Sequence, residues 1–208
     1  MAIQGKGYAW RHEGSEATET TLSNSDIYKI RKKRHAFGSA NHENYLCKCF
    51  YANVRSLVNR VKMAELEMYV NNEDPDIIGL TESWASDKIT NGELKLEGYD
   101  MFRKDRVTEG MDKQRGGGVL LYVKHKWNAV QREDIYNDMF KESVWCEIGQ
   151  KNSKLLIGVC YRVPNADEEV DKGLYELISK ANKESVIIMG DFNFHVNWHS
   201  LEGETHKD

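Results

Sequence analysis

Short apolar stretches separated by polar turns constrain the fold of this chain more than any other feature. Seven such stretches occur, at residues 45–54, 76–83, 99–105, 117–124, 142–149, 154–163 and 185–192. Their length and their β-branched and aromatic residues predict buried strands. Two longer segments have helical periodicity. The order is strand, helix, strand, several strands, helix and strand, which predicts an α/β sandwich and not a strict alternation of strands and helices.

Each helical segment carries one apolar stripe on an otherwise polar surface. Residues 56–72 predict a helix that begins at an N-cap serine, Ser56, and ends before Pro75. Residues 167–183 predict a second helix, with acidic residues at its start and lysines at its end, as the helix dipole favours. The expected buried positions are Leu57, Val61, Ala64 and Met68 in the first helix and Val170, Leu174, Leu177 and Ala181 in the second.

Residues 1–44 differ from the rest of the chain, because they are polar and lack strong periodicity. We expect this segment to be largely disordered, and we expect residues 45–208 to form one domain. The basic cluster at residues 28–35, YKIRKKRH, fits either a solvated surface stretch or an arm for nuclear import or phosphate contact.

The overall composition places the chain among ordinary intracellular proteins. The net charge of -4 gives no global basic field, so any contact with DNA must come from a local patch. The four cysteines lie in strand-like stretches, which predicts buried, reduced thiols. The chain has no signal-peptide pattern and no apolar run long enough to span a bilayer. We therefore expect a nuclear or cytoplasmic protein.

Polar residues of a particular kind follow several of the apolar runs. Asn53 and Glu82 come after the first two predicted strands, Tyr161 and Arg162 end the run at 154–163, and Asp191 and Asn193 follow the last run. Each residue alone has an ordinary explanation as a loop acid, a turn asparagine or a half-buried aromatic. Together they form a set of hard oxygen ligands, which suits Mg²⁺ or Mn²⁺ with a phosphate.

Five motifs resemble the endonuclease/exonuclease/phosphatase superfamily, and in particular the endonuclease domain of non-LTR retrotransposons. They are NVRSL at 53–57, PDIIGLTESW at 75–84, RGGGVLLYV at 115–123, GVCYRVPN at 158–165 and MGDFNFHVNW at 189–198. The resemblance implies a four-layered α/β sandwich, two mixed sheets flanked by helices. It also implies divalent-metal-dependent cleavage of DNA phosphodiesters, with a reverse transcriptase domain downstream as the partner.

The resemblance also implies a role for each strand-end residue. Glu82 and Asn53 would bind the metal, Tyr161 would contact the scissile phosphate, and Asp191 would orient the attacking water. Asn193 would stabilise the charge that develops during cleavage. The DNA backbone would be contacted by Arg115 and Arg162, although the alternative for each is an ordinary surface arginine.

The family pattern continues with an aspartate and a Ser-Asp-His segment that this sequence does not contain. His195, His199 and His206 follow the last strand too closely to replace them. We therefore expect a C-terminally truncated domain with weak or no nuclease activity, in which strand 185–190 lies near an unpaired sheet edge. The alternatives are an inactive remnant or binding fragment of the same fold, and another phosphoesterase of the superfamily.

Overall fold

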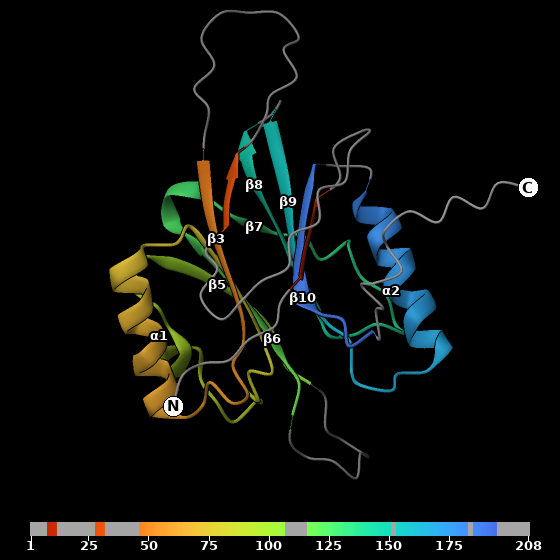
Figure 1. Cartoon of the computed structure of the whole chain (residues 1–208), viewed down its shortest axis with the longest axis horizontal. Coiled ribbons are helices and arrows are strands. Elements are labelled where there is room, and N and C mark those ends of the chain that lie inside the picture. Colours follow the sequence, from red (N-terminus) through yellow and green to blue (C-terminus); the bar gives the residue numbers. More distant parts are fainter. Residues whose placement is uncertain are drawn as a thin grey trace, which may run out of the picture.

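The computed structural model places two stacked β-sheets between two helices (Figure 1). It describes residues 8–11, 28–31, 46–106, 116–150, 153–182 and 185–194. One sheet has the strand order β2 (Tyr28–Arg31), β3 (Leu46–Asn53), β4 (Ile77–Thr81), β6 (Val119–Lys124) and β5 (Tyr99–Lys104). The other has the order β1 (Tyr8–Arg11), β10 (Val186–Asp191), β9 (Ser153–Tyr161), β8 (Ser143–Gln150) and β7 (Val130–Gln131). All seven predicted strands are confirmed, and β1, β2 and β7 are additional.

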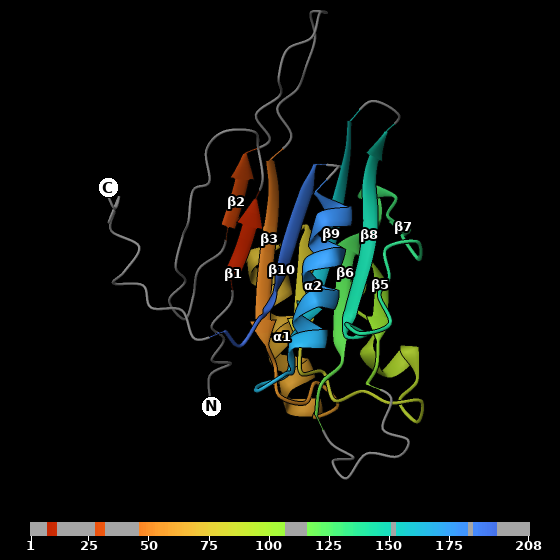
Figure 2. The ribbon, with the colours of Figure 1, turned by 90° about the vertical axis from the view of Figure 1, so that its right-hand side faces the viewer.

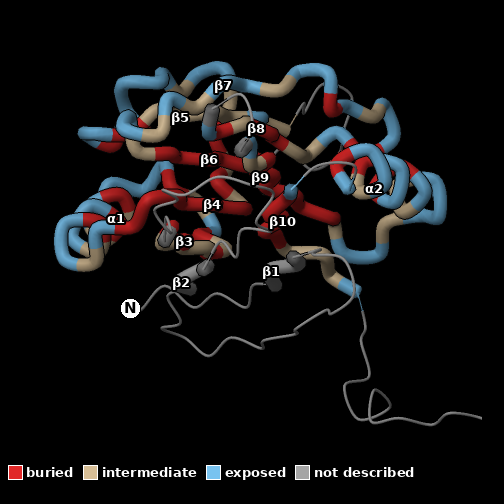
Figure 3. The backbone as a smooth tube through the Cα atoms, turned by 90° about the horizontal axis from the view of Figure 1, so that it is seen from above, coloured by how far each residue is buried: buried red, intermediate tan, exposed pale blue. Residues whose placement is uncertain are grey.

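Three clusters of buried side chains hold four layers together. Figure 3 shows that the buried residues gather along the strands of the two sheets, with exposed residues on the outer sides of the helices. The central cluster joins the facing sides of the two sheets, for example Leu121 of β6 and Val159 of β9. A second cluster packs α1 (Arg60–Glu73) on the outer face of the β3–β4–β6 sheet. A third packs α2 (Glu168–Ala181) on the outer face of the β8–β9–β10 sheet, which Figure 2 shows from the α2 side. The predicted four-layered sandwich is confirmed.

The pairing directions bring particular strand ends together. β3 runs parallel to β4, with Asn53 opposite Thr81, and β9 runs parallel to β10, with Tyr161 opposite Asp191. The carboxyl ends of parallel strands lie at the same edge of a sheet, so each sheet presents one pair of strand ends and the loops that follow them. Two short 3₁₀ turns, η1 (Asn91–Leu94) and η2 (His125–Trp127), complete the described elements.

The predicted buried stripe of the first helix is wrong. Val61 and Met68 are 66% and 65% exposed, and Ala64 is also exposed. The buried residues are Met63, Leu66 and Val70. The helix also begins later than predicted, because the N-cap is Asn59, whose side chain accepts a hydrogen bond from the amide of Val61.

Ser56, the predicted N-cap, instead belongs to a turn that joins β3 to the helix. It has a φ of 84°, and its amide donates to the carbonyl oxygen of Glu82 at 2.7 Å. The next amide, that of Leu57, donates to the carbonyl oxygen of Ser83 at 2.9 Å. Leu57 is buried as predicted, but by this turn and not by the helix.

The second helix matches its prediction. Leu174, Leu177 and Ala181 are buried against the sheet, and Val170 packs at the margin of the same cluster. Asp167 is the N-cap, and its side chain accepts from the amide of Val170 at 2.9 Å. All four cysteines are buried free thiols, as predicted. Neither of the helices in the described part of the chain combines the length and the apolar character needed to cross a membrane.

The strand that ends at Asp191 does not lie at a sheet edge, so that expectation is wrong. β1 pairs antiparallel with β10, with Tyr8 opposite Gly190. In the other sheet, β2 pairs antiparallel with β3, with Tyr28 opposite Cys49. Both strands come from residues 1–44, the segment that we expected to be largely disordered. Its other residues lie outside the described part of the chain.

Candidate active site

Direct side-chain hydrogen bonds join the two sheets at their strand ends. The amide nitrogen Nδ2 of Asn53, at the end of β3, donates to Oδ2 of Asp191, at the end of β10, at 2.9 Å. In the same place, the hydroxyl of Tyr161, at the end of β9, donates to Oε1 of Glu82, which follows β4. The four residues predicted from the strand ends therefore lie together, two from each sheet.

Glu82 is held in a fixed orientation by three donors. Besides Tyr161, the indole Nε1 of Trp84 donates to Oε2 at 2.5 Å, and the amide of Gly117 donates to the same oxygen at 2.9 Å. Burial opposes ionisation of this carboxyl, but the three hydrogen bonds outweigh it and hold the pKa of Glu82 below its ordinary value. Glu82 is therefore a preorganised, ionised carboxylate.

The backbone around Glu82 is unusual. Glu82 and Trp84 both have left-handed conformations, with φ of 57° and 55°. The residue between them, Ser83, is buried, and its amide donates to the carbonyl oxygen of Gly118. Non-glycine residues in this region cost free energy and gather at functional sites. Here the strained turn directs Glu82 toward Tyr161.

Asp191 has an environment different from that of Glu82. Burial raises its pKa, the hydrogen bond from Asn53 acts in the opposite direction, and the negative charge of Glu82 adds to the rise. The amide of Asn193 also donates to Oδ1 of Asp191, at 3.3 Å. The site therefore contains two carboxyl groups with opposite pKa shifts, which is the pattern expected when two acids have different roles.

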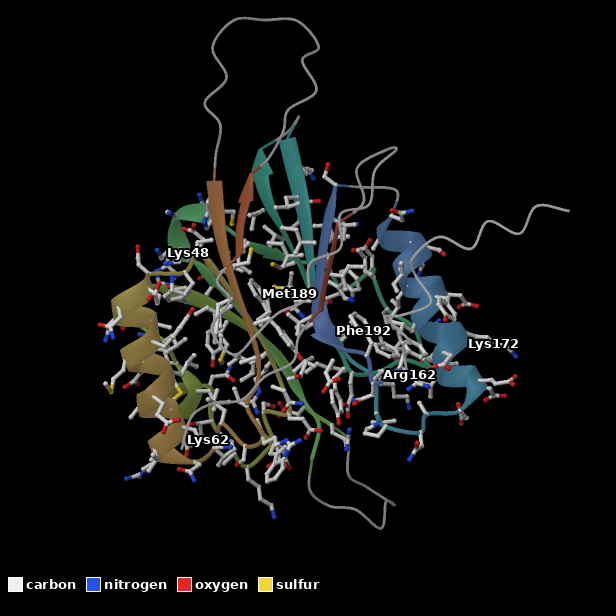
Figure 4. The ribbon with its side chains drawn as sticks, in the orientation of Figure 1. Lys48, Lys62, Arg162, Lys172, Met189 and Phe192 are labelled. Atoms are coloured by element: carbon white, nitrogen blue, oxygen red, sulfur yellow. The ribbon has the colours of Figure 1, made fainter. Side chains whose placement is uncertain are left out.

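Arg162 and Asn193 lie together just beyond the end of β10. Nδ2 of Asn193 donates to the carbonyl oxygen of Arg162 at 2.7 Å, and Nη1 of Arg162 donates to the carbonyl oxygen of Asn193 at 3.2 Å. Arg162 is only 6% exposed, and its guanidinium also forms a two-point ion pair with Asp171 of α2. Figure 4 shows Arg162 beside α2. Its described contacts are therefore within the domain, and they hold the Asn193 loop.

The residues present fit a divalent cation. Oδ1 of Asn53 is buried and accepts no hydrogen bond from the described residues, although the other end of this amide is bound to Asp191. An orphaned carbonyl oxygen near an ionised carboxylate suits a hard cation, and Mg²⁺ takes few protein ligands and keeps several waters. No cluster of three His, Cys, Asp or Glu side chains able to hold a metal occurs among the described residues.

Arg115, a predicted site residue, lies outside the described part of the chain, as do His195, His199 and His206, which we did not expect to act in the site. Trp84 and Gly117, which orient Glu82, were not predicted from the sequence, nor was the ion pair of Arg106 with Glu142 beside them. The ESW and triple-glycine motifs contain the first two, so those motifs were the available signal.

Two stacked mixed sheets with carboxylates and amides at their strand ends define a layered α/β protein of the phosphoesterase type. The chain belongs to the endonuclease/exonuclease/phosphatase family, whose sequence model matches residues 50–203. A comparison with curated protein sequences gave no match.

Solved structures with the same fold have low sequence identity. The endonuclease domain of TRAS1, a telomere-specific non-LTR retrotransposon, is 16% identical with a TM-score of 0.51, over 71% of this chain and 59% of that one. The AP endonuclease LMAP from Leishmania major is 13% identical with a TM-score of 0.54, over 74% and 59%. The 3′ phosphatase NExo from Neisseria is 14% identical with a TM-score of 0.50, over 70% and 56%. The chain thus spans less than two thirds of these proteins' length, and the likeness is one of fold.

Proposed function

We propose that this domain is a divalent-metal-dependent DNA endonuclease that nicks one strand, of the kind found in non-LTR retrotransposons. The observation that carries the proposal is the Asn53–Asp191 contact between the sheets, next to Glu82 and Tyr161. It brings an ionised carboxylate, a buried carbonyl oxygen without a described hydrogen-bond donor and a second carboxylate of raised pKa into one site. Those are the groups that phosphodiester hydrolysis requires.

Each residue has one task in this proposal. Glu82 and Asn53 hold Mg²⁺ or Mn²⁺, which when bound neutralises a phosphate oxygen and eases departure of the leaving group. Asp191 accepts a hydrogen bond from the attacking water and aligns it, and its raised pKa makes it a stronger base than an exposed aspartate. As the negative charge of the phosphate grows, the hydroxyl of Tyr161 turns from Glu82 to donate to it, and Asn193 donates the amide hydrogen that is not bonded to the carbonyl of Arg162.

Several groups could hold the DNA itself. Arg55 is exposed, and its charge acts on Asp191, which puts a guanidinium at the margin of the site. Arg115 stays a candidate for contact with the DNA backbone, whereas Arg162 is buried and paired with Asp171. A reverse transcriptase domain downstream is the expected partner, and a nuclease of this kind needs access to nuclear DNA.

The test is nicking of supercoiled plasmid by the purified chain in Mg²⁺, because one cut per molecule makes even slow hydrolysis visible. We expect Glu82→Gln and Asp191→Asn each to lower the rate by about 10²-fold or more. The matched control is Asp74→Asn. Asp74 is an acid at the opposite end of β4, with a left-handed φ of 50° that asparagine tolerates.

The substrate class is tested in the same assay. Plain duplex, duplex with an abasic site and an inositol phosphate are offered at equal phosphate concentration. Cleavage of plain duplex supports the retrotransposon type. Exclusive cleavage at the abasic site, or release of inorganic phosphate alone, would assign the site to another phosphoesterase reaction. Equal rates for the wild type and Asp191→Asn would contradict the proposed chemistry.

A further inference from the structure

A partly buried arginine lies beside the site and has no role in the chemistry described above. Arg106 follows β5, and its side chain is 18% exposed. Its Nε donates to Oε1 of Glu142, and its Nη2 donates to Oε2 of Glu142 at 3.0 Å. Glu142 precedes β8 and is 12% exposed. One carboxylate thus fixes one edge of the guanidinium in a two-point contact.

The other edge of this guanidinium faces the candidate active site. Its Cζ lies 5.6 Å from the centre of the Tyr161 ring. A Cβ built on Gly116 would lie 3.3 Å from Nη1 of Arg106 and 3.7 Å from Oε2 of Glu82, so both groups border the same small volume. Nη1 makes no hydrogen bond to any described residue, whereas Nε and Nη2 are both used.

The triple glycine at 116–118 creates the space for this arrangement. All three glycines have positive φ, from 70° to 120°. A Cβ on Gly117 would lie 2.4 Å from Cζ of Arg106, and a Cβ on Gly118 would lie 2.5 Å from Oγ of Ser83. Any side chain at 117 would therefore displace the guanidinium. The same residue donates its amide to Glu82, so one loop positions both the carboxylate and the arginine.

We propose that Arg106 binds the scissile phosphate, with its Nη1 edge donating to a non-bridging oxygen while Glu142 and the Tyr161 ring hold the guanidinium in place. The inference rests on the proposed phosphodiesterase function. Its physical basis is charge: Glu82, Asp191 and Glu142 are all acidic, and a phosphate entering among them needs a cation that is already oriented. A planar guanidinium, with one edge that the described residues leave without a hydrogen bond, meets that need better than a lysine.

The test is duplex DNA binding, measured by fluorescence anisotropy in EDTA, so that it does not depend on cleavage. A labelled duplex is titrated with the wild type and with Arg106→Gln over a series of salt concentrations. The slope of log K against log salt changes by about 0.9 for each phosphate that the protein no longer neutralises. We expect the slope for Arg106→Gln to be shallower by about that much and its binding to be about tenfold weaker at 0.1 M salt. Arg106→Lys should keep most of the slope.

The chain offers a matched control for the loss of a partly buried, paired arginine. Arg132 is 22% exposed, and its Nη1 donates to Glu147 at 2.9 Å. Glu147 is five residues beyond Glu142, about 17 Å further along an extended strand. Arg132→Gln removes the same charge far from the site, so its slope should match the wild type.

Arg106→Gln alone leaves the partly buried carboxylate of Glu142 without its ion-pair partner, which destabilises the fold. The double variant Arg106→Gln/Glu142→Gln removes the charge of Arg106 without leaving that carboxylate unpaired. Its slope should be as shallow as that of Arg106→Gln. Equal salt slopes for this variant and the wild type would overturn the phosphate contact of Arg106 but leave the nuclease proposal intact. A lower nicking rate of this variant with unchanged duplex binding would have the same consequence. Absence of duplex binding by the wild type would overturn both.

Discussion

Gly190 gives the sharpest test of the strand packing, because a methyl group there would meet backbone and not a movable side chain. A Cβ at this position would lie 2.0 Å from the carbonyl oxygen of Cys160. Gly190 is opposite Cys160 in the β9–β10 ladder and opposite Tyr8 in the β1–β10 ladder. Strands on both sides therefore confine it, and the strain of Gly190→Ala can be relieved only by separating β9 from β10.

The size of the effect follows from that geometry. Ordinary van der Waals contacts begin at 3.4 Å, so the distance from this Cβ to the carbonyl oxygen of Cys160 must increase from 2.0 Å by 1.4 Å. Overpacking of this kind costs about 1–3 kcal/mol. The shift would also weaken the hydrogen bond from the amide of Arg162 to the carbonyl oxygen of Asp191, now 2.9 Å, at about 1 kcal/mol. We expect Gly190→Ala to lower the free energy of unfolding by about 2–4 kcal/mol.

Urea unfolding followed by circular dichroism measures this loss. The matched control is Gly92→Ala, because a Cβ there would contact only Oγ1 of Thr90, at an ordinary 3.8 Å. That variant should be neutral or more stable by up to about 1 kcal/mol. Gly190→Ala should also reduce nicking by about 10²-fold, since it displaces Asp191 by an ångström or so. A Gly190→Ala protein as stable as the Gly92→Ala protein would refute the close approach of β9 and β10.

Three further predictions test the helix face, Glu82 and the N-terminal strands. Leu66→Ala should cost about 2–5 kcal/mol in urea unfolding and Met68→Ala less than about 0.5; equal costs would contradict the observed burial. The pKa of Glu82 is lowered from 4.5, so its ionised form stabilises the fold above that pH and the contribution is lost as the pH falls through the folded-state pKa. The stability advantage of the wild type over Glu82→Gln should therefore shrink between about pH 5 and about pH 3, and a constant difference would refute this. Deletion of residues 1–44 exposes the edges of β3 and β10 and should cause association on size-exclusion chromatography; a stable monomer would contradict it.

The strands could be predicted from the sequence because burial on both faces leaves a local trace, a short apolar run. The face of α1 could not, because this helix carries apolar residues on more than one side. Val61 and Met68 share a stripe at helical spacing, yet Leu66 and Val70 are the residues that the sheet buries. The choice is made by the turn at Ser56, whose amide is bound to the Glu82 loop and so fixes how the helix leaves β3.

In the site, too, residues marked by a local sequence pattern could be predicted, and residues paired across a long stretch of sequence could not. Glu82 and Asp191 could be located because each follows a buried strand, where a carboxylate requires a reason. Arg106 and Glu142 are 36 residues apart in the sequence, so no local pattern joins them. Only the triple glycine hints at the pair, because it leaves room for a guanidinium that is distant in sequence.

The geometry of the site depends on how closely the two sheets pack, since Asn53 and Asp191 come from different sheets. Beneath the site, a Cβ on Gly79 of β4 would lie 3.0 Å from Cγ2 of Val159 and 3.1 Å from Cε of Met189. Met189 lies between the sheets in Figure 4 and directly precedes Gly190. Gly79 thus permits the close packing of the sheets that brings Asn53 within 2.9 Å of Asp191. The packing that stabilises the fold is therefore also the packing that aligns the site, and a loss of one should appear as a loss of the other.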